Sequence, residues 1–351
     1  MRLDSIKLKR FRCYDNAEFS FSEYCNVIQG KNGSGKTSLL EAIAFLSAGR
    51  SPRTLKEREL LKFSESSCGI YAEFESGGRA RTLEAEMSIG VKRRIMLDGA
   101  PVKSSRELLG NLPSVYFSPE DLEFFRGGSA LRRRFLDMTL CQLKPRYMSV
   151  LATYKRVIEG KAALLKQSRE KQSFLEALPE FNLRIASLGA ELADWRDKIS
   201  GVIASAAAGH HASISGCGEE LNISYITHAR DAEKTLIELE NRKSEEIARA
   251  QCLIGAHKDD LRAELNGREI AAFGSQGQTR TAAISVKLAQ RDVLSDGFEE
   301  PPLLLLDDVL SELDARRREY ILNHLDGGQV FITCCGIEGL EKTGNGNYIV
   351  L

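Results

Sequence analysis

The sequence lacks an excess of charge and the residue biases that mark unusual folds. Its 351 residues include 49 basic and 49 acidic side chains, so the formal net charge is zero. It contains only 29 glycines and eight prolines, while 42% of the residues are hydrophobic. This composition excludes a disordered or collagen-like chain and indicates a globular protein with two domains, or one domain with an insertion. A neutral chain has no overall attraction to nucleic acid, although a local basic patch can still bind it.

Long apolar runs and clustered cysteines are also missing. No run approaches the roughly 18 to 20 residues that a membrane-spanning helix needs. Six of the first fourteen residues are charged, so we expect no secretory signal. The eight cysteines are scattered, and Cys334 and Cys335 are adjacent instead of spaced as zinc ligands. The sequence therefore predicts a cytoplasmic protein with reduced thiols and no membrane partner.

The first and last thirds of the chain share strand signals. Short apolar runs separated by turn residues, such as Asp98-Gly99, fill residues 1–125, and one helix is predicted over 36–48. Strand signals return in the last third, where residues 303–306 form a continuous apolar run. A sheet that is interrupted and then resumed indicates that both segments fold together. We predict one discontinuous lobe made of residues 1–125 and 251–351.

The middle of the chain has a helical pattern instead. Turn residues are few in residues 126–250, and apolar residues between 178 and 199 recur at steps of three and four. A second apolar stripe between 147 and 165 supplies an antiparallel partner, with the connection inside 168–179. We predict a helical arm over 126–250 that contains a short antiparallel coiled coil. A plain helical domain whose only role is packing is the alternative.

One segment matches the phosphate-binding pattern G-x-x-x-x-G-K-[ST] in full. The match consists of Gly30, Lys31, Asn32, Gly33, Ser34, Gly35, Lys36 and Thr37. It follows a predicted strand over 25–29 and opens the predicted helix, as such a loop requires. Backbone N–H groups and the helix N-terminus favour phosphate there, Lys36 would hold the β and γ phosphates of ATP, and the Thr37 hydroxyl would ligate Mg²⁺. A glycine-rich turn with an exposed lysine is the alternative.

A second acidic element follows much later in the chain. The apolar run over 303–306 ends in Asp307 and Asp308, which is the form of a Walker B strand. Asp307 is placed to hold the magnesium through water, and Asp308 to orient or deprotonate the attacking water. Lys36 and Asp308 are therefore the candidate catalytic residues. Simple turn chemistry at a strand end is the alternative for the acidic pair.

The spacing of these elements indicates the kind of P-loop protein. Lys36 and Asp307 lie 271 positions apart (307 minus 36). An insertion of this length with a helical arm inside it points to the ATP-binding cassette (ABC) group that includes SMC and Rad50 proteins. We therefore predict an α/β fold of the ABC type, an SMC/Rad50-like P-loop ATPase head with an inserted helical arm domain.

That group carries a signature upstream of Walker B, and a similar sequence is present here. It consists of Ser275, Gln276, Gly277 and Gln278, and a helix is predicted over 279–291. A serine, a glycine and a helix N-terminus again suit phosphate, in this group the γ phosphate that the other subunit holds. The signature therefore predicts an ATP-dependent homodimer arranged head to tail, and residues 311–314 follow Walker B like the D-loop of the same group.

Together, these motifs resemble the RecF family of bacterial recombination mediators over nearly the whole chain. The segments that carry the resemblance are Leu8 to Tyr14, Gly30 to Thr37, Phe117 to Leu122, Leu131 to Asp137, Gly255 to Asp260, Ser275 to Gln278 and Leu304 to Asp314. The arm is tens of residues long rather than hundreds and has no C-x-x-C hook, which separates this family from SMC and Rad50 proteins.

The resemblance implies a weak, DNA-stimulated ATPase that uses hydrolysis as a switch. It also implies dimerisation around two ATP molecules and binding to gapped DNA and single-strand/double-strand junctions. RecO and RecR would be partners in loading RecA, in support of replication restart and SOS induction. The motifs by themselves extend only to a Mg-ATP-dependent dimerising switch.

Two positions depart from related proteins. Transporter cassettes place a histidine after the last core strand to sense the γ phosphate, whereas residues 331–334 contain none. Thr333 can make a hydrogen bond there but cannot act as a base. Cys13 stands where an asparagine is common in the family, and Arg12 remains the candidate nucleotide contact.

A local excess of basic residues is the candidate DNA-binding surface. Residues 126–170 contain eleven Lys or Arg and three Asp or Glu, an excess of eight positive charges. The densest part consists of Arg132, Arg133, Arg134, Lys144 and Arg146. Phosphate binding requires such a cluster, and the absence of an aromatic ladder predicts binding without sequence preference. A solvated helix face, or ion pairs within the protein, is the alternative.

His257 lies close in sequence to Asp259 and Asp260, which suggests a metal or acid–base site. No second histidine or cysteine falls at a ligand spacing, so a structural role or a contact near the nucleotide is favoured.

Three functions remain in competition. The motifs favour a DNA-repair switch, and the alternative is the ATPase subunit of a Rad50-like DNA nuclease complex. No acidic metal cluster beyond the ATP site appears in the sequence, which counts against nuclease activity in this chain. A transporter ATPase subunit is disfavoured by the long arm and by the missing histidine.

Overall fold

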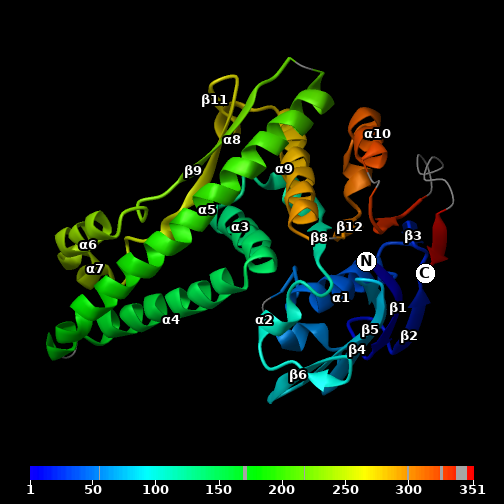
Figure 1. Cartoon of the computed structure of the whole chain (residues 1–351), viewed down its shortest axis with the longest axis horizontal. Coiled ribbons are helices and arrows are strands. Elements are labelled where there is room, and N and C mark those ends of the chain that lie inside the picture. Colours follow the sequence, from blue (N-terminus) through cyan, green and yellow to red (C-terminus); the bar gives the residue numbers. More distant parts are fainter. Residues whose placement is uncertain (55, 169–171, 217, 299, 325–326, 337–345) are drawn as a thin grey trace. The chain divides into compact units, whose positions relative to one another are not determined.

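The computed structural model describes residues 1–54, 56–168, 172–216, 218–298, 300–324, 327–336 and 346–351 (Figure 1). Within these residues the chain divides into two units. Unit 1 consists of Met1–Glu123, Ser213–Gly216 and Ala283–Leu351, and unit 2 consists of Phe124–Ala212 and Cys217–Ala282.

Apolar runs from both ends of the chain form one parallel sheet in unit 1. Its strand order is β14-β3-β13-β12-β8, and each neighbouring pair runs parallel. The strands are β3 (Cys25–Gln29), β8 (Ser114–Phe117), β12 (Leu303–Asp307), β13 (Val330–Cys334) and β14 (Asn347–Val350). Every residue of β12 and β13 is buried, as expected for strands that are covered on both faces. The strands predicted over 25–29 and 303–306 therefore lie inside this sheet, on either side of β13.

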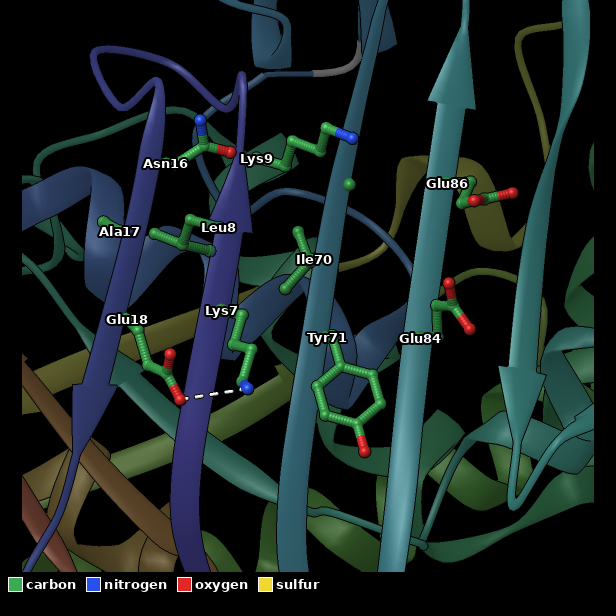
Figure 2. Close-up of a pocket in the computed structure, with 11 residues that line it drawn as sticks. Lys7, Leu8, Lys9, Asn16, Ala17, Glu18, Ile70, Tyr71, Glu84 and Glu86 are labelled. Carbon is green, nitrogen blue, oxygen red and sulfur yellow. Dashed lines mark ion pairs between the residues drawn. The ribbon is translucent and has the colours of Figure 1, made fainter.

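The second sheet of unit 1 is antiparallel, with the order β2-β1-β4-β5-β6-β7. Its strands are β1 (Arg2–Lys9), β2 (Asn16–Ser20), β4 (Ser67–Ser76), β5 (Arg79–Ser88), β6 (Val91–Leu97) and β7 (Ala100–Pro101). The predicted turn at Asp98-Gly99 joins β6 to β7, and both residues have positive φ, as a tight hairpin turn of this type requires. Figure 2 shows the polar outer face, where Lys7 and Glu18 form an ion pair at 3.0 Å beside a shallow hollow of about 540 Å³.

One helix, α1 (Lys36–Ala48), joins the core of the two sheets and begins and ends where the sequence predicted. It is buried on nearly all sides, and its apolar residues share one core with residues of both sheets. Gly49 ends the helix in the left-handed conformation, at φ 65°. The shorter elements of unit 1 are η1 (Glu57–Leu60), α2 (Ser105–Leu108), η2 (Pro119–Glu123), η5 (Val309–Glu312) and α10 (Ala315–Asn323).

Unit 2 is mainly helical and contains one small sheet. Its helices are α3 (Ser129–Leu143), α4 (Pro145–Gln167), α6 (Ala232–Asn241), α7 (Lys243–Arg249) and α8 (Ile270–Phe273), together with α5 (Leu178–Ser215) except its last three residues, the first turns of α9 (Gln276–Gly297) and the short turns η3 (Gln172–Ala177) and η4 (Ala256–Lys258). The sheet has the order β11-β10-β9 and consists of β9 (Leu221–Ile226), β10 (Asp260–Leu265) and β11 (Arg268–Glu269). None of the helices in the described ranges combines the length and the apolar character that a membrane span requires.

Helices α4 and α5 run antiparallel in close contact. Tyr147 near the start of α4 packs edge-to-face on Trp195 of α5, with 5.6 Å between ring centroids. Near the other end of α4, a Cβ atom on Gly160 would lie 2.8 Å from the ring of Phe181, so the missing side chain allows the close approach. Part of the connection predicted inside 168–179, residues 169–171, lies outside the described residues.

The small sheet of unit 2 differs from the pattern read in the sequence. Strand β9 lies inside the segment predicted to be helical, and it pairs antiparallel with β10, which the sequence assigned to the other lobe. Short strands are hard to detect when their partner is distant in sequence, because the pairing supplies much of their stability. The lobe boundary at residue 250 stays a prediction.

Candidate functional site

The P-loop, residues 30–37, connects β3 to α1 in unit 1. Gly33 and Gly35 have φ values of 84° and 108°, which side chains rarely adopt. A Cβ atom at Gly35 would also lie 2.7 Å from the Tyr14 hydroxyl and 2.8 Å from the Cys13 thiol. Glycine is therefore needed at position 35 for conformation and for space, so that the loop can turn its N–H groups toward one point.

The Lys36 side chain lies against this loop. Its Nζ donates to the carbonyl oxygens of Gly30 at 2.5 Å and Lys31 at 3.0 Å, and it lies 3.5 Å from the Cys335 thiol. A phosphate would compete with these carbonyls for the ammonium group, and its negative charge would make it the preferred acceptor. The Ser34 hydroxyl is buried in the same loop without a hydrogen-bond partner among the described residues.

Asp307, at the end of β12, is buried and accepts hydrogen bonds from three hydroxyl groups. Thr37 on α1 and Thr333 on β13 donate to its Oδ1 at 2.9 and 3.0 Å. Tyr116 on β8 donates to its Oδ2 at 2.6 Å. Burial and the neighbouring Asp307 charge both raise the pKa of Tyr116, so the phenol stays protonated as a donor.

Asp308 follows in the left-handed conformation, with φ 54°. Its N–H donates to the Thr333 hydroxyl at 2.8 Å, and its carbonyl accepts from Ser311 at 2.6 Å. Its carboxylate oxygen Oδ1 is buried and has no hydrogen-bond partner within the described ranges. The backbone therefore fixes Asp308 on both sides and leaves one carboxylate oxygen free to bind water.

These residues fit a magnesium ion. Mg²⁺ prefers oxygen ligands, and the Thr37 hydroxyl and the Asp307 carboxylate supply them within 2.9 Å of each other. The unpartnered Oδ1 of Asp308 lies on the residue next to Asp307. The Thr37 oxygen can also bind a metal while its hydroxyl proton is donated to Asp307.

Arg12 is held by protein groups. It donates from Nε and Nη2 to the two oxygens of Glu41, at 2.8 and 2.6 Å, and from Nη1 to the Glu59 carbonyl. Glu41 is fully buried on α1, one turn after Thr37, and also accepts from Ser51 and Arg53. Arg12 is thus anchored beside α1, and its contact with a nucleotide stays a prediction.

The signature residues open helix α9 in unit 2. The Ser275 hydroxyl accepts from the Gln278 N–H at 3.2 Å, and the Gln278 side-chain oxygen accepts from the Ser275 N–H at 2.8 Å. This reciprocal pair is a capping box, and Gln276 and Gly277 form the first turn between its two members. The Gln278 amide also donates to Glu219 at 2.7 Å. Helix capping and phosphate binding are compatible here, because the helix N-terminus stays oriented in both cases.

The predicted DNA-contacting residues differ in their surroundings. Arg132 is buried and donates to both oxygens of Asp260, at 2.6 and 2.9 Å. It also donates to three backbone carbonyls. We therefore no longer include Arg132 in the proposed DNA surface. Arg133 donates to the Asp259 carbonyl at 2.7 Å, and Arg134 also has partners within the protein. Lys144 and Arg146 are exposed, although Arg146 pairs with Glu191 at 2.8 Å.

Unit 2 contains a buried charge network that the sequence did not reveal. Arg196 on α5 donates to the carboxylates of Asp259 at 2.7 Å and Asp137 at 2.8 Å. The Tyr147 hydroxyl also donates to Asp137, and the Tyr225 hydroxyl to Asp259. These residues come from separate helices and strands, so no local pattern could have identified the network.

His257 belongs to the same region and has a structural environment. Its Nδ1 lies 3.0 Å from the Tyr154 hydroxyl, and its Nε2 lies 3.0 Å from the Cys252 carbonyl. Burial lowers the pKa of His257, which keeps the ring neutral. The two hydrogen bonds use both ring nitrogens, which supports a structural role for this histidine.

Comparison with known proteins identifies close relatives over the whole chain. The family described as RecF/RecN/SMC N terminal domain matches residues 2–348. DNA replication and repair protein RecF from Acetivibrio thermocellus is 34% identical over 360 residues, which cover 100% of this chain and 98% of the relative. The protein of the same name from Lachnoclostridium phytofermentans is 35% identical over 342 residues, covering 96% and 94%.

Solved structures give the same result for the fold. The recombination mediator protein RecF-ATP of the RecFOR pathway superimposes with a TM-score of 0.90 at 32% identity, covering 97% of this chain and 93% of that one. An SMC head bound to the C-winged helix domain of ScpA superimposes with a TM-score of 0.56 at 15% identity, covering 96% and 90%, and shows likeness in fold alone. The chain has the ABC-type ATPase head fold, and by its sequence and its structure it belongs to the RecF family.

Proposed function

We propose that this chain is an ATP-dependent DNA-binding protein of recombinational repair. It closes into a dimer on Mg-ATP, binds DNA at single-strand gaps and single-strand/double-strand junctions, and helps RecO and RecR to load RecA, in support of replication restart and SOS induction. The observation that carries the proposal is the 2.9 Å hydrogen bond between Thr37 and Asp307, which unites two distant motifs in a chain with full-length RecF relatives. The name of those relatives supports the role in replication and repair.

The nucleotide site has a residue for each part of phosphate chemistry. The N–H groups of residues 30–37 and the Lys36 ammonium would bind the phosphates, and Thr37 and Asp307 would hold Mg²⁺. The ion, when bound, neutralises charge between the β and γ phosphates. Asp308 would orient or deprotonate the attacking water through its free Oδ1. Hydrolysis serves here as a weak, DNA-stimulated switch, so a low rate is sufficient.

The dimer would use the signature of a second copy. Residues 275–278 at the start of α9 would reach the γ phosphate that the P-loop of the other copy holds. Each copy would therefore be incomplete without the other, and ATP would link the two. The capping box supports this role, because it fixes the first turn of α9 before any phosphate arrives.

The proposed DNA surface is smaller than the sequence suggested. It consists mainly of Lys144 and Arg146, which are exposed. Arg133 and Arg134 would contribute less, because both have partners within the protein. Each phosphate contact that is lost should reduce the salt dependence of DNA binding by about one unit of log–log slope.

Binding to defined DNA substrates tests the proposal. Fluorescence anisotropy compares a labelled gapped duplex with a fully paired duplex of the same length, with ATP and Mg²⁺ or with EDTA. We expect binding that needs Mg-ATP and favours the gap. Equal affinity for both duplexes with nucleotide bound would contradict gap recognition, and absence of DNA binding would contradict the proposed function.

A further inference from the structure

We propose that Tyr116 is a positioning residue of the metal site, whose hydroxyl holds the second oxygen of Asp307 in the orientation that a magnesium-bound water requires. The inference rests on the proposed function, because it assumes that Mg-ATP binds beside Asp307. Tyr116 belongs to none of the motifs, although it immediately precedes Phe117 and the following 3₁₀ turn.

The pairing of the strands brings Tyr116 to the metal site. β8 and β12 run parallel, and Tyr116 pairs with Leu305. Side chains two residues apart on a strand share a face, so Asp307 lies on the same face as Leu305 and one step nearer the strand end. The Tyr116 side chain spans that step and donates to Oδ2 of Asp307 at 2.6 Å.

The three hydroxyl groups together fix the plane of the carboxylate. Oδ1 accepts from Thr37 and Thr333, and Oδ2 accepts from Tyr116. Rotation of the carboxylate about its Cβ–Cγ bond would break hydrogen bonds at both oxygens. Without Tyr116, Oδ2 would keep no donor from the described part of the chain, and the carboxylate could turn about the two threonine contacts.

This orientation matters for magnesium in particular. Mg²⁺ demands near-ideal octahedral geometry and keeps several water molecules, which must donate to correctly placed oxygens. Hydrogen bonds to a ligating or water-binding carboxylate typically change metal affinity or activity by about 10- to 100-fold when they are removed. The short O–H···O distance at Oδ2 is typical of a hydrogen bond to an ionised acceptor.

Tyr116→Phe removes the hydroxyl and keeps the ring, which packs against the core of unit 1. Tyr71→Phe is the matched control. The Tyr71 hydroxyl also donates to a carboxylate, that of Glu73 at 3.1 Å, but it lies on the outer face of the antiparallel sheet (Figure 2). Both variants lose a tyrosine-to-carboxylate hydrogen bond in the same unit, and only Tyr116→Phe affects the carboxylate of the proposed metal site.

The experiment measures binding of a fluorescent ATP analogue to the full chain at increasing Mg²⁺, and separately in EDTA. For Tyr116→Phe we expect about a tenfold higher Mg²⁺ concentration at half-maximal effect, within the range for such partners. Affinity in EDTA should match that of the wild type, because the P-loop itself is unchanged. Tyr71→Phe should match the wild type in both conditions.

The outcomes separate this inference from the proposed function. A wild-type chain whose ATP affinity does not respond to Mg²⁺ contradicts both. If the wild type responds and Tyr116→Phe has the same Mg²⁺ dependence, only the inference is wrong. A loss of affinity in EDTA as large as the loss with Mg²⁺ also overturns it, because Tyr116 would then support the loop rather than the metal carboxylate.

Discussion

Two sets of buried carboxylates, Asp307 in unit 1 and Asp137 with Asp259 in unit 2, are held in opposite ways. In unit 1, Asp307 accepts hydrogen bonds from three neutral hydroxyl groups, and no basic side chain of the described chain lies within ion-pair distance of it. In unit 2, Asp137 and Asp259 both contact the guanidinium of Arg196, which is only 3% exposed.

The difference separates a binding site from a structural core. A buried carboxylate that already faces an arginine has its charge balanced, so breaking the pair costs stability. A buried carboxylate that has only hydroxyl donors keeps an unbalanced charge, which a cation can neutralise. The orientation by hydroxyls and the missing counter-charge together support the proposal that Asp307 holds a metal, whereas Arg196 balances the charges of Asp137 and Asp259 in unit 2.

The largest effect is expected from Arg196→Met. This change leaves two buried carboxylates without their cation, which should lower the free energy of unfolding of unit 2 by about 3–5 kcal/mol. Urea unfolding followed by the fluorescence of Trp195 measures it, because this single tryptophan packs on Tyr147 within the network. The matched control is Arg184→Met on the same helix, where an exposed pair with Glu180 is lost and at most about 0.5 kcal/mol should change. Equal stability of the two variants would refute the structural role of the network.

A different loss is expected from Asp307→Asn. The amide has nearly the same shape but no charge for the metal, so ATP hydrolysis should fall by at least about 100-fold. Stability should not decrease, because the change removes a buried and unbalanced charge. Phosphate release and the urea midpoint measure the two effects. A clear destabilisation with hydrolysis retained would mean that Asp307 is structural, and the contrast between the units would disappear.

The smallest effect concerns pH and the neutral His257 in unit 2. Burial holds the pKa of His257 below that of the unfolded chain, so unfolding takes up a proton when the pH falls below about 6.5. Stability should therefore decrease as the pH is lowered from 7 to 5, by no more than about 1.4 kcal/mol per pH unit for one proton. His257→Gln should reduce this pH dependence, and His228→Gln, at an exposed histidine of the same unit, serves as the control substitution. If His257→Gln keeps the full slope, another group is responsible.

The parts of the fold that the sequence predicted are those with local signals. Helix α1 has the predicted bounds because the P-loop defines its start and Gly49 its end. Strand β12 was predicted from the uninterrupted apolar run at residues 303–306, whereas β3, which contains Asn26 and Gln29, was predicted from its position directly before the P-loop. The same local logic predicted the positions of the P-loop and of the acidic pair at residues 307 and 308.

The parts that were missed depend on contacts between distant segments. Nothing near Tyr116 indicates that its hydroxyl reaches Asp307, since that requires β8 to pair with β12 in one register. Arg132 reads as an exposed base in a basic cluster, yet Asp260, 128 positions later, binds it. Charge counting in a sequence cannot show which bases are already paired, and this limits prediction of the DNA surface more than that of the nucleotide site.

The most direct test of the account is the mass of the chain in solution, measured by sedimentation with and without Mg-ATP. Asp308→Asn is used to slow hydrolysis and hold the ATP state, and Ser275→Arg is introduced to block the signature. Asp231→Ala, which removes a capping side chain from α6, controls for the loss of a helix cap. We expect Mg-ATP to double the mass, and we expect Ser275→Arg alone to prevent this while nucleotide still binds. A chain that stays monomeric with ATP demonstrably bound, with and without gapped DNA, would contradict the ATP-dependent dimer.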